Sequence, residues 1–400
     1  MDQLLTKFQQ LKDKHLHIDM SRGKPSKEQL DLSNEMNDVL TSESDYLSEE
    51  GIDVRNYGGL LGIKEARKLM GDVLGVKEDN VIIFGNSSLE AMYQQIARSF
   101  LFGVCGSTPW NKLEKVQWLC PAPGYDRHFV MLEEFGIEML EVPYYNDGPD
   151  MDFIEALVLE ENVKGLWIVP KYSNPLGITY SDEVIKRLAR LKPAAKDFRI
   201  YVDNAYALQD FEGETLLLNI YEEAKKVGNE DILYLFTSTS KITFPGSGIA
   251  ALGASENNIN DIASHLKYQT ISYDKVNQLR HVRYFKDVNG LKEHTRKHGE
   301  ILKKKFEIVD AYLSKYCNDV ASWSTPKGGY FITLYVSHKA KEVVERCKEC
   351  GVILTDAGAM FPYRHDSSNS YIRLAPSYVS EDELHQAMEV ICLAIVIETK

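Results

Sequence analysis

Residues 232–253 have the sequence ILYLFTSTSKITFPGSGIAALG, and this stretch decides the fold class. A short apolar run leads into a polar segment that contains Lys241, and a second apolar run follows. Continuous apolar runs of this length are typical of strands that are buried on both faces of a sheet. The stretch therefore predicts two strands of a central sheet, with Lys241 just beyond the end of the first.

Five similar apolar runs precede this stretch, and helical patterns separate several of them. They are VIIFG at 81–85, VQWLCPAP at 116–123, IEMLEVP at 137–143, GLWIVP at 165–170 and RIYVD at 199–203. The alternation indicates a largely parallel sheet with crossover helices, which is an α/β architecture. Because ligands of such sheets bind beyond the carboxyl ends of the strands, the functional residues should directly follow these runs.

The pattern changes near residue 290. A long charged helix is expected at 291–316, and short strands and a final helix with a capping box at Ser380 and Glu383 follow it.

A chain of 400 residues exceeds what one compact core usually fills. We therefore expect a large sheet-based domain at 51–290 and a smaller α+β domain at 291–400. The N-terminal segment 1–50 is expected to belong to the small domain.

The composition narrows the class of protein. The formal net charge of −13, without a basic stripe, argues against a nucleic-acid partner. The N-terminal sequence has no apolar signal-peptide run, and no run of about 18 apolar residues occurs, so we expect no membrane partner and a cytoplasmic location. The ten histidines show no paired ligand spacing, and Cys347 and Cys350 fit one helix that ends at Gly351, so no metal site is predicted.

Polar residues follow four of the predicted strands. They are Gly85-Asn86-Ser87-Ser88, Asn174-Pro175, Asp203-Asn204-Ala205-Tyr206 and Ser238-Thr239-Ser240-Lys241. Singly, each has an ordinary structural explanation: Asn-Pro is a common turn, and Ser87-x-x-Glu90 is by itself a helix N-cap box. Together, an amide, a carboxylate, a phenol and a lysine at successive strand ends converge on one pocket. A pyridine cofactor with a phosphate needs such a set.

These motifs resemble those of the fold-type I, class I aminotransferases, and most closely the aspartate aminotransferases related to the bacterial type Ic enzymes. The resemblance covers nearly the whole chain, and its most specific motifs are Ser-x-Ser-Lys at 238–241, Asp-x-x-Tyr at 203–206, Asn-Pro at 174–175 and Tyr-Ile-Arg-Leu at 371–374. It implies an α/β fold-type I transferase that binds pyridoxal 5'-phosphate and acts as a homodimer. The implied reaction is transamination between an amino acid and a 2-oxo acid, with aspartate and 2-oxoglutarate as the expected pair.

The resemblance assigns catalytic roles to four residues. Lys241 would hold the cofactor as a Schiff base and, once displaced by substrate, would move a proton between the substrate Cα and the cofactor. Asp203 would pair with the pyridinium nitrogen, which keeps the ring an electron sink. Asn174 and Tyr206 would donate to the ring oxygen. The structural alternatives are a surface lysine, a strand-capping aspartate, a turn asparagine and a core-edge tyrosine.

The remaining cofactor contacts follow from the same resemblance. The phosphate would be bound by Asn86, Ser87 and Ser88 at a helix start and by the hydroxyl of Ser238. Tyr125, in PAPGYDRH, would stack on the ring, or else it is only a packing anchor. Tyr57, in RNYGGLLG, would reach the phosphate of the partner subunit, which makes the active site composite.

Substrate recognition is expected from the C-terminal part and the N-terminus. Arg373 would grip the substrate α-carboxylate with a planar guanidinium, helped by Asn174, and Gly23 would let its loop approach the substrate closely. The family usually carries a phosphate-binding arginine about eight residues after the lysine, but Ser247 and Gly248 stand there in this chain. A cation for a distal carboxylate would come from one of four candidates: Arg22, Lys275, Arg280 and Arg283.

Two other classes of function stay open at this point. A lyase or synthase could use the same lysine and aspartate, because fold does not determine the reaction. A non-enzymatic ligand-sensing regulator with this fold would carry an added helix-turn-helix domain, for which these 400 residues leave no room.

Overall fold

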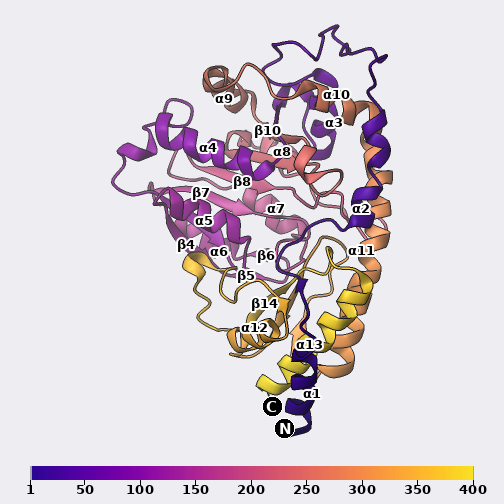
Figure 1. Ribbon diagram of the computed structural model, residues 1–400. Helices are drawn as coiled ribbons and strands as arrows, with labels where there is room; N and C mark the ends of the chain where they lie inside the picture. Colours follow the sequence, from indigo (N-terminus) through magenta and orange to yellow (C-terminus); the bar gives the residue numbers. More distant parts are fainter. Residues whose placement is uncertain (1, 400) are drawn as a thin grey trace.

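The computed structural model describes residues 2–399 and is built around a seven-stranded sheet (Figure 1). In spatial order the strands are β2 (Val81–Phe84), β10 (Ala250–Ala254), β9 (Leu233–Ser238), β8 (Arg199–Asp203), β7 (Val163–Ile168), β3 (Gln117–Pro121) and β4 (Glu138–Val142). Strand β10 runs antiparallel to both of its neighbours, and the other pairs are parallel. The predicted largely parallel α/β sheet is confirmed. The antiparallel strand arises because the chain turns straight back after Lys241.

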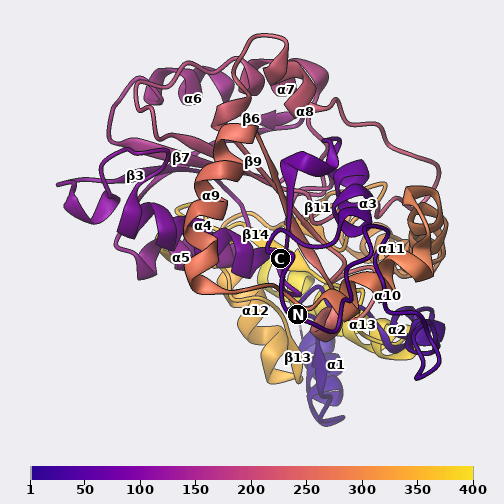
Figure 2. The same cartoon turned by 90° about the horizontal axis from the view of Figure 1, so that it is seen from above.

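Helices cover both faces of this sheet. One face packs against α3 (Lys64–Leu74), α6 (Met151–Leu157), α7 (Asp182–Ala189) and α8 (Ile220–Lys225). The other packs against α4 (Ser88–Phe102), α5 (Asp126–Glu134) and α9 (Glu256–Gln269). Figure 2 shows α6 and α7 on one side of the sheet and α4 and α5 on the other.

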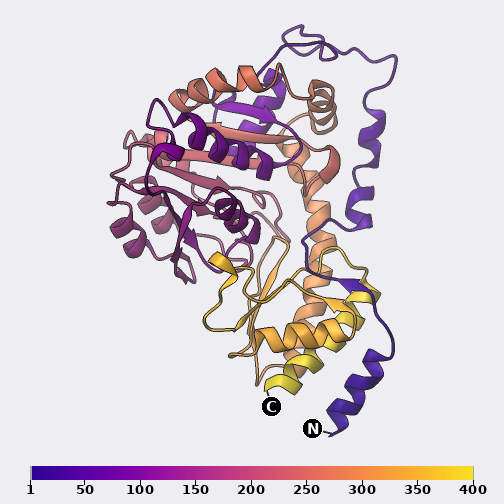
Figure 3. The same cartoon turned by 60° about the vertical axis from the view of Figure 1, so that its left-hand side comes forward.

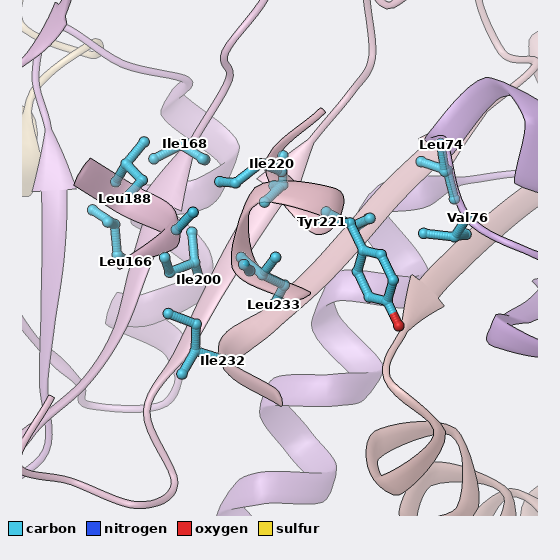
Figure 4. Packing of buried hydrophobic residues seen from close by; sticks show 14 of the residues in the cluster. Leu74, Val76, Leu166, Ile168, Leu188, Ile200, Ile220, Tyr221, Ile232 and Leu233 are labelled. Atoms are coloured by element: carbon cyan, nitrogen blue, oxygen red, sulfur yellow. The ribbon is translucent and has the colours of Figure 1, made fainter. Parts of the chain in front are cut away.

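The side chains of each strand alternate between these two layers. On β8, Ile200 packs into the first layer and Tyr201 into the second. Ile200, Leu166 and Leu233 from three neighbouring strands meet in the close view of Figure 4. With both faces buried, the sheet is rigid, and only the strand ends remain available for a ligand.

A second, smaller sheet lies in the C-terminal region. It contains β11 (Ser322–Trp323), β12 (Ile332–Tyr335) and β14 (Tyr371–Leu374), with antiparallel pairing. Its core is shared with α1 (Asp2–Lys12), α12 (Ala340–Glu349), α13 (Glu381–Thr399) and part of α11 (Val288–Tyr316). Near the N-terminus, β1 (Ile18–Asp19) pairs with β13 (Val352–Ile353). Because the first helix α1 and the last helix α13 share one core, the two ends of the chain lie at the same end of the molecule (Figures 1 and 3).

Several local predictions are confirmed. The long helix expected at 291–316 is α11, which runs from the large sheet to the small one (Figure 1). Ser380 and Glu383 exchange the two bonds of a capping box. Cys347 and Cys350 lie buried at the end of α12, and Gly351 follows with a φ of +82°. Across residues 2–399, no helix has the length and apolarity needed to cross a membrane.

Three further segments complete the α-helices and β-strands. They are α2 (Lys27–Asp31), α10 (Lys275–Phe285) and the hairpin of β5 (Tyr144–Tyr145) and β6 (Gly148–Pro149). Helix α10 follows α9 and carries three of the four candidate cations, and α2 lies on the N-terminal segment that leads from the small sheet to the large one.

Candidate active site

A cavity of about 490 Å³ lies beyond the carboxyl ends of β7, β8 and β9. The small sheet contributes Arg373 and the N-terminal segment contributes residues 22–24 to its wall. Most of the residues singled out in the sequence line it: Gly23, Ser87, Ser88, Tyr125, Asn174, Asp203, Tyr206, Ser238, Lys241 and Arg373. Asn86 and Tyr57 do not.

Lys241 lies at the centre of this wall, directly after β9. Its Nζ is 5.1 Å from the ring centroid of Tyr206 and 5.9 Å from that of Tyr330. Burial lowers the pKa of the Lys241 amine, and the nearby Arg373 lowers it further, while Asp203 opposes the change. A larger fraction of the Lys241 amine is therefore neutral than for an exposed lysine at the same pH. Only the neutral form can act as a nucleophile or base.

The backbone next to Lys241 is held by side chains from distant segments. The hydroxyl of Tyr330 donates to the carbonyl of Lys241 at 3.3 Å. The carbonyl of Ile242 accepts from His294 Nε2 at 2.9 Å and from Ser33 Oγ at 3.4 Å. These donors are buried and come from the N-terminal segment, α11 and the loop before β12. Because these donors come from three separate segments, the backbone of Lys241 and Ile242 is held in place, while Lys241 lines the cavity.

Asp203 ends β8 and is only 4% exposed. Its Oδ2 lies 3.2 Å from His128 Nε2, and the His128 ring stacks on Trp167 at a centroid distance of 4.2 Å. Across the described chain, Asp203 Oδ1 has no hydrogen-bond partner although it is buried. A buried carboxylate oxygen without a partner is costly, so this atom is suited to a cationic N–H of a bound ligand.

The N-terminus of α4 forms the opposite end of the cavity. Ser87 is the N-cap residue, yet its side chain makes no capping hydrogen bond. The N-cap box suggested by Ser87 and Glu90 is therefore wrong, because the Ser87 side chain lines the cavity instead. The first backbone amides of a helix have no partner within it and favour an anion such as phosphate.

Asn86 has a structural contact near this end. Its side-chain amide donates to the carbonyl of Pro245 at 2.9 Å, and its own carbonyl accepts from Ser240 Oγ at 2.9 Å. Asn86 thus joins the α4 end of the cavity to the loop that follows Lys241.

Arg373 lies on β14 and is 1% exposed. Its Nη1 donates to Asp126 Oδ1 and to Asn174 Oδ1, both at 3.1 Å. Its Nε and Nη2 donate to Thr355 Oγ1 at 3.3 and 3.1 Å, and Nη2 also donates to the Ser21 carbonyl at 3.2 Å. The guanidinium is held rigidly at the edge of the cavity.

Several residues that sequence reasoning missed belong to this site. Asp126, Arg127 and His128 directly follow Tyr125 and form the first turn of α5, shortly after the end of β3, so their position after a strand end was an available signal. Arg127 lines the cavity and His128 contacts Asp203. Phe331 also lines the cavity, and a Cβ at Gly23 would lie 2.6 Å from its ring, so any larger residue at position 23 would clash.

Tyr57 and three of the candidate cations lie away from this cavity. The Tyr57 side chain is 81% exposed. Lys275 Nζ donates to the carbonyl of Asn56, beside Tyr57, at 2.8 Å. Arg280 Nη2 donates to Ser247 Oγ at 3.0 Å. Lys275, Arg280 and Arg283 do not line this cavity, whereas Arg22, Lys24 and Arg127 do.

Comparisons with known proteins define the class. The sequence model of the aspartate amino-transferase family matches residues 1–400. An aspartate aminotransferase of Corynebacterium glutamicum is 44% identical over 398 residues, which are 98% of this chain and 91% of that protein. A crystal structure of an aspartate transaminase from C. glutamicum superposes with a TM-score of 0.96 at 42% identity, covering 100% of this chain and 95% of the other.

The same fold extends to more distant enzymes. The structure of an α-aminoadipate aminotransferase from Thermus thermophilus gives a TM-score of 0.79 at 19% identity, covering 98% of this chain and 94% of that one. Fold and site together define a fold-type I, class I aminotransferase. The chain belongs to the aspartate aminotransferase family, and it is an aminotransferase, as the sequence motifs predicted.

Proposed function

We propose that this enzyme transfers the amino group of aspartate to 2-oxoglutarate, with pyridoxal 5'-phosphate as its cofactor. One observation carries the proposal: Lys241, Asp203 and Arg373 line a single cavity at the carboxyl ends of the strands. The name of the C. glutamicum relative supports aspartate as a substrate.

The residues present fit this cofactor. When bound, pyridoxal 5'-phosphate supplies an electron sink for the negative charge that develops at the substrate Cα. The free Oδ1 of Asp203 would accept from the protonated ring nitrogen, and the α4 N-terminus with Ser87, Ser88 and Ser238 would hold the phosphate. The α-aminoadipate aminotransferase of the same fold was crystallised with N-(5'-phosphopyridoxyl)-L-leucine, which supports the assignment.

Other side chains would place the ring. Tyr206 lies buried in the cavity wall, and Tyr125 lies half-buried in it. Burial raises the pKa of Tyr125 to about 12 and that of Tyr206 well above its usual value, so both stay protonated donors at neutral pH. Asn174 has its Oδ1 bound to Arg373, which links the ring oxygen site to the carboxylate site.

Lys241 would remove a proton from the substrate Cα and deliver it to the cofactor. This role needs a neutral amine, and burial together with Arg373 supplies it by lowering the pKa of Lys241. The backbone contacts of Lys241 and Ile242 would keep the amine in line with the reacting atoms.

Arg373 would bind the substrate α-carboxylate, since its planar guanidinium matches that group. A dicarboxylate needs a second cation, and Arg22, Lys24 and Arg127 stand in the same cavity wall. In the family the partner subunit can also supply cations, and Arg280 remains a candidate of that kind. We propose a homodimer in which the exposed Tyr57 of one subunit reaches the phosphate of the other.

We also propose the domain division at residues 50 and 290. Two separate hydrophobic cores support it, one around the large sheet and one that joins Phe8 and Ile18 to the C-terminal region.

Two measurements test the proposed function. Borohydride treatment of the purified yellow enzyme should attach the cofactor irreversibly to the peptide that contains Lys241; a label on another lysine would exclude the assignment. A screen of single amino acids, followed by the cofactor's absorbance, should give the fastest change with aspartate and glutamate. Release of ammonia without any 2-oxo acid acceptor would instead identify a lyase.

A further inference from the structure

The Arg373 guanidinium already has its donors in use. A guanidinium has five N–H bonds. Nε and one N–H of Nη2 point to Thr355, the other N–H of Nη2 points to the Ser21 carbonyl, and Nη1 serves Asp126 and Asn174. A substrate carboxylate that binds here must therefore take the place of at least one of these acceptors.

Asp126 is the only one of these acceptors that carries a charge. Burial acts to raise the pKa of its carboxyl, but Arg373 and Arg22 together outweigh burial and lower that pKa, so Asp126 is ionised at neutral pH and repels an incoming carboxylate. The other acceptors are a carbonyl, a hydroxyl and an amide, which do not. Among the acceptors of Arg373, only Asp126 therefore repels a substrate carboxylate.

Asp126 also forms an ion pair with a second arginine, Arg22. Its Oδ2 accepts from Arg22 Nη1 at 3.0 Å, and the Arg22 side chain is 42% exposed, against 1% for Arg373, so packing confines Arg22 much less. A neighbouring cavity of about 420 Å³ is lined by both Asp126 and Arg22 and offers space into which the pair can move. Asp126 could leave Arg373 without becoming an unpaired buried charge.

We propose that Asp126 is an internal carboxylate that occupies the substrate's place on Arg373, and that substrate binding exchanges one carboxylate for another while Arg22 retains Asp126. The inference rests on the proposed function in one respect, namely that Arg373 receives the substrate carboxylate. The exchange makes Asp126 a specificity-determining residue. It keeps weakly binding anions off Arg373 and admits only ligands whose carboxylate competes successfully.

The test measures binding rather than turnover. Propionate, which has one carboxylate and no amino group, is titrated calorimetrically into the holoenzyme. Asp126→Asn should bind propionate about tenfold more tightly than wild type, since one competing charged acceptor is lost. Arg22→Gln should bind it several-fold more weakly, because Asp126 then has no alternative partner.

The double variant makes the test specific. In the Asp126→Asn background, Arg22→Gln should leave propionate affinity unchanged; an equal loss in both backgrounds would show that Arg22 acts on the ligand directly. Unchanged or weaker propionate binding in Asp126→Asn, or an unaltered affinity in Arg22→Gln, would overturn the exchange. Asp261→Asn is the matched control, because Asp261 also pairs with a buried arginine, Arg98, at 15% exposure against 13% for Asp126, but lines neither the active-site cavity nor the neighbouring cavity that Asp126 lines.

The proposed function is judged separately in the same preparations. If wild type fails to transaminate aspartate while Asp126→Asn still gains propionate affinity, the exchange stands and the substrate assignment falls. If transamination proceeds and the affinity does not change, the exchange alone is wrong.

Discussion

The two halves of the cavity treat charge in opposite ways. On the side of the large sheet, Asp203 keeps a buried oxygen without a partner in the described chain, and Lys241 makes no ion pair there. On the side of the small sheet, Arg373 has every donor engaged and shares Asp126 with Arg22. The first half is prepared for a ligand that stays, such as a cofactor. The second half is satisfied by itself, which suits a ligand that enters and leaves in every turnover.

The largest effect on activity is expected from a substitution of Asp203, in the large-sheet half of the cavity. Asp203→Ala should lower kcat for transamination by about 100-fold or more, since the variant lacks the ionic partner that we propose for the ring nitrogen of the cofactor. Circular dichroism should show that the fold is retained. Asp197→Ala is the matched control: Asp197 is as deeply buried, but it bonds to Lys164 and Trp110. The control should lose stability and keep its kcat per folded active site; equal loss of kcat in both variants would remove the special role of Asp203.

A substitution of Arg373, in the small-sheet half of the cavity, should mainly weaken substrate binding. Arg373→Lys should raise KM for both the amino acid and the 2-oxo acid by about 10- to 100-fold, because a point charge cannot reproduce the two-pronged contact. Steady-state kinetics with each substrate varied in turn measure this effect. Arg98→Lys, a change at another buried arginine, should leave both KM values as they are. Identical specificity constants for Arg373→Lys and wild type would show that the carboxylate binds elsewhere.

Lys241 should make the free energy of unfolding depend on pH. Burial lowers the pKa of Lys241 below its ordinary value of 10.5, so between the two values the unfolded chain binds more protons than the folded protein. The free energy of unfolding of the cofactor-free protein therefore rises with pH across that window. Lys241→Met should be more stable than wild type at pH 7, and the difference should shrink towards pH 10.5. Denaturant titrations at several pH values measure it, and a constant difference would mean that Lys241 is solvated in the folded protein.

The smallest effect is expected at the root of Lys241. Tyr330→Phe removes the hydrogen bond to the Lys241 carbonyl and the one that the hydroxyl accepts from Gln29 Nε2, which should cost about 0.5–1.5 kcal/mol of stability each. Because Ile242 is still held by His294, kcat should fall by only a few-fold. A kcat loss as large as that of Asp203→Ala would show that the backbone contacts, rather than the ring partner, limit the rate.

Much of the fold followed from local patterns. The continuous apolar runs identified the strands of the large sheet, and the capping box of Ser380 and Glu383 marked the start of the last helix. The helix start at Ser88 was also predicted; Ser87 lines the cavity, where the phosphate-binding prediction placed it, and its side chain does not cap α4. Hydroxyl groups at a helix start have two competing uses, and the sequence does not distinguish them.

The sequence by itself determined which chemical groups stand at the ends of the strands, and hence that Asp203, Asn174 and Lys241 meet, because parallel strands end at one edge of a sheet. Only the tertiary structure decided what those groups touch. Asp126 bonds to Arg22 over a separation of 104 residues and to Arg373 over 247 residues, and no local pattern links them. These pairings depend on how the small sheet packs against the large one. The side-chain contacts across that junction are therefore set by packing and not by any one segment.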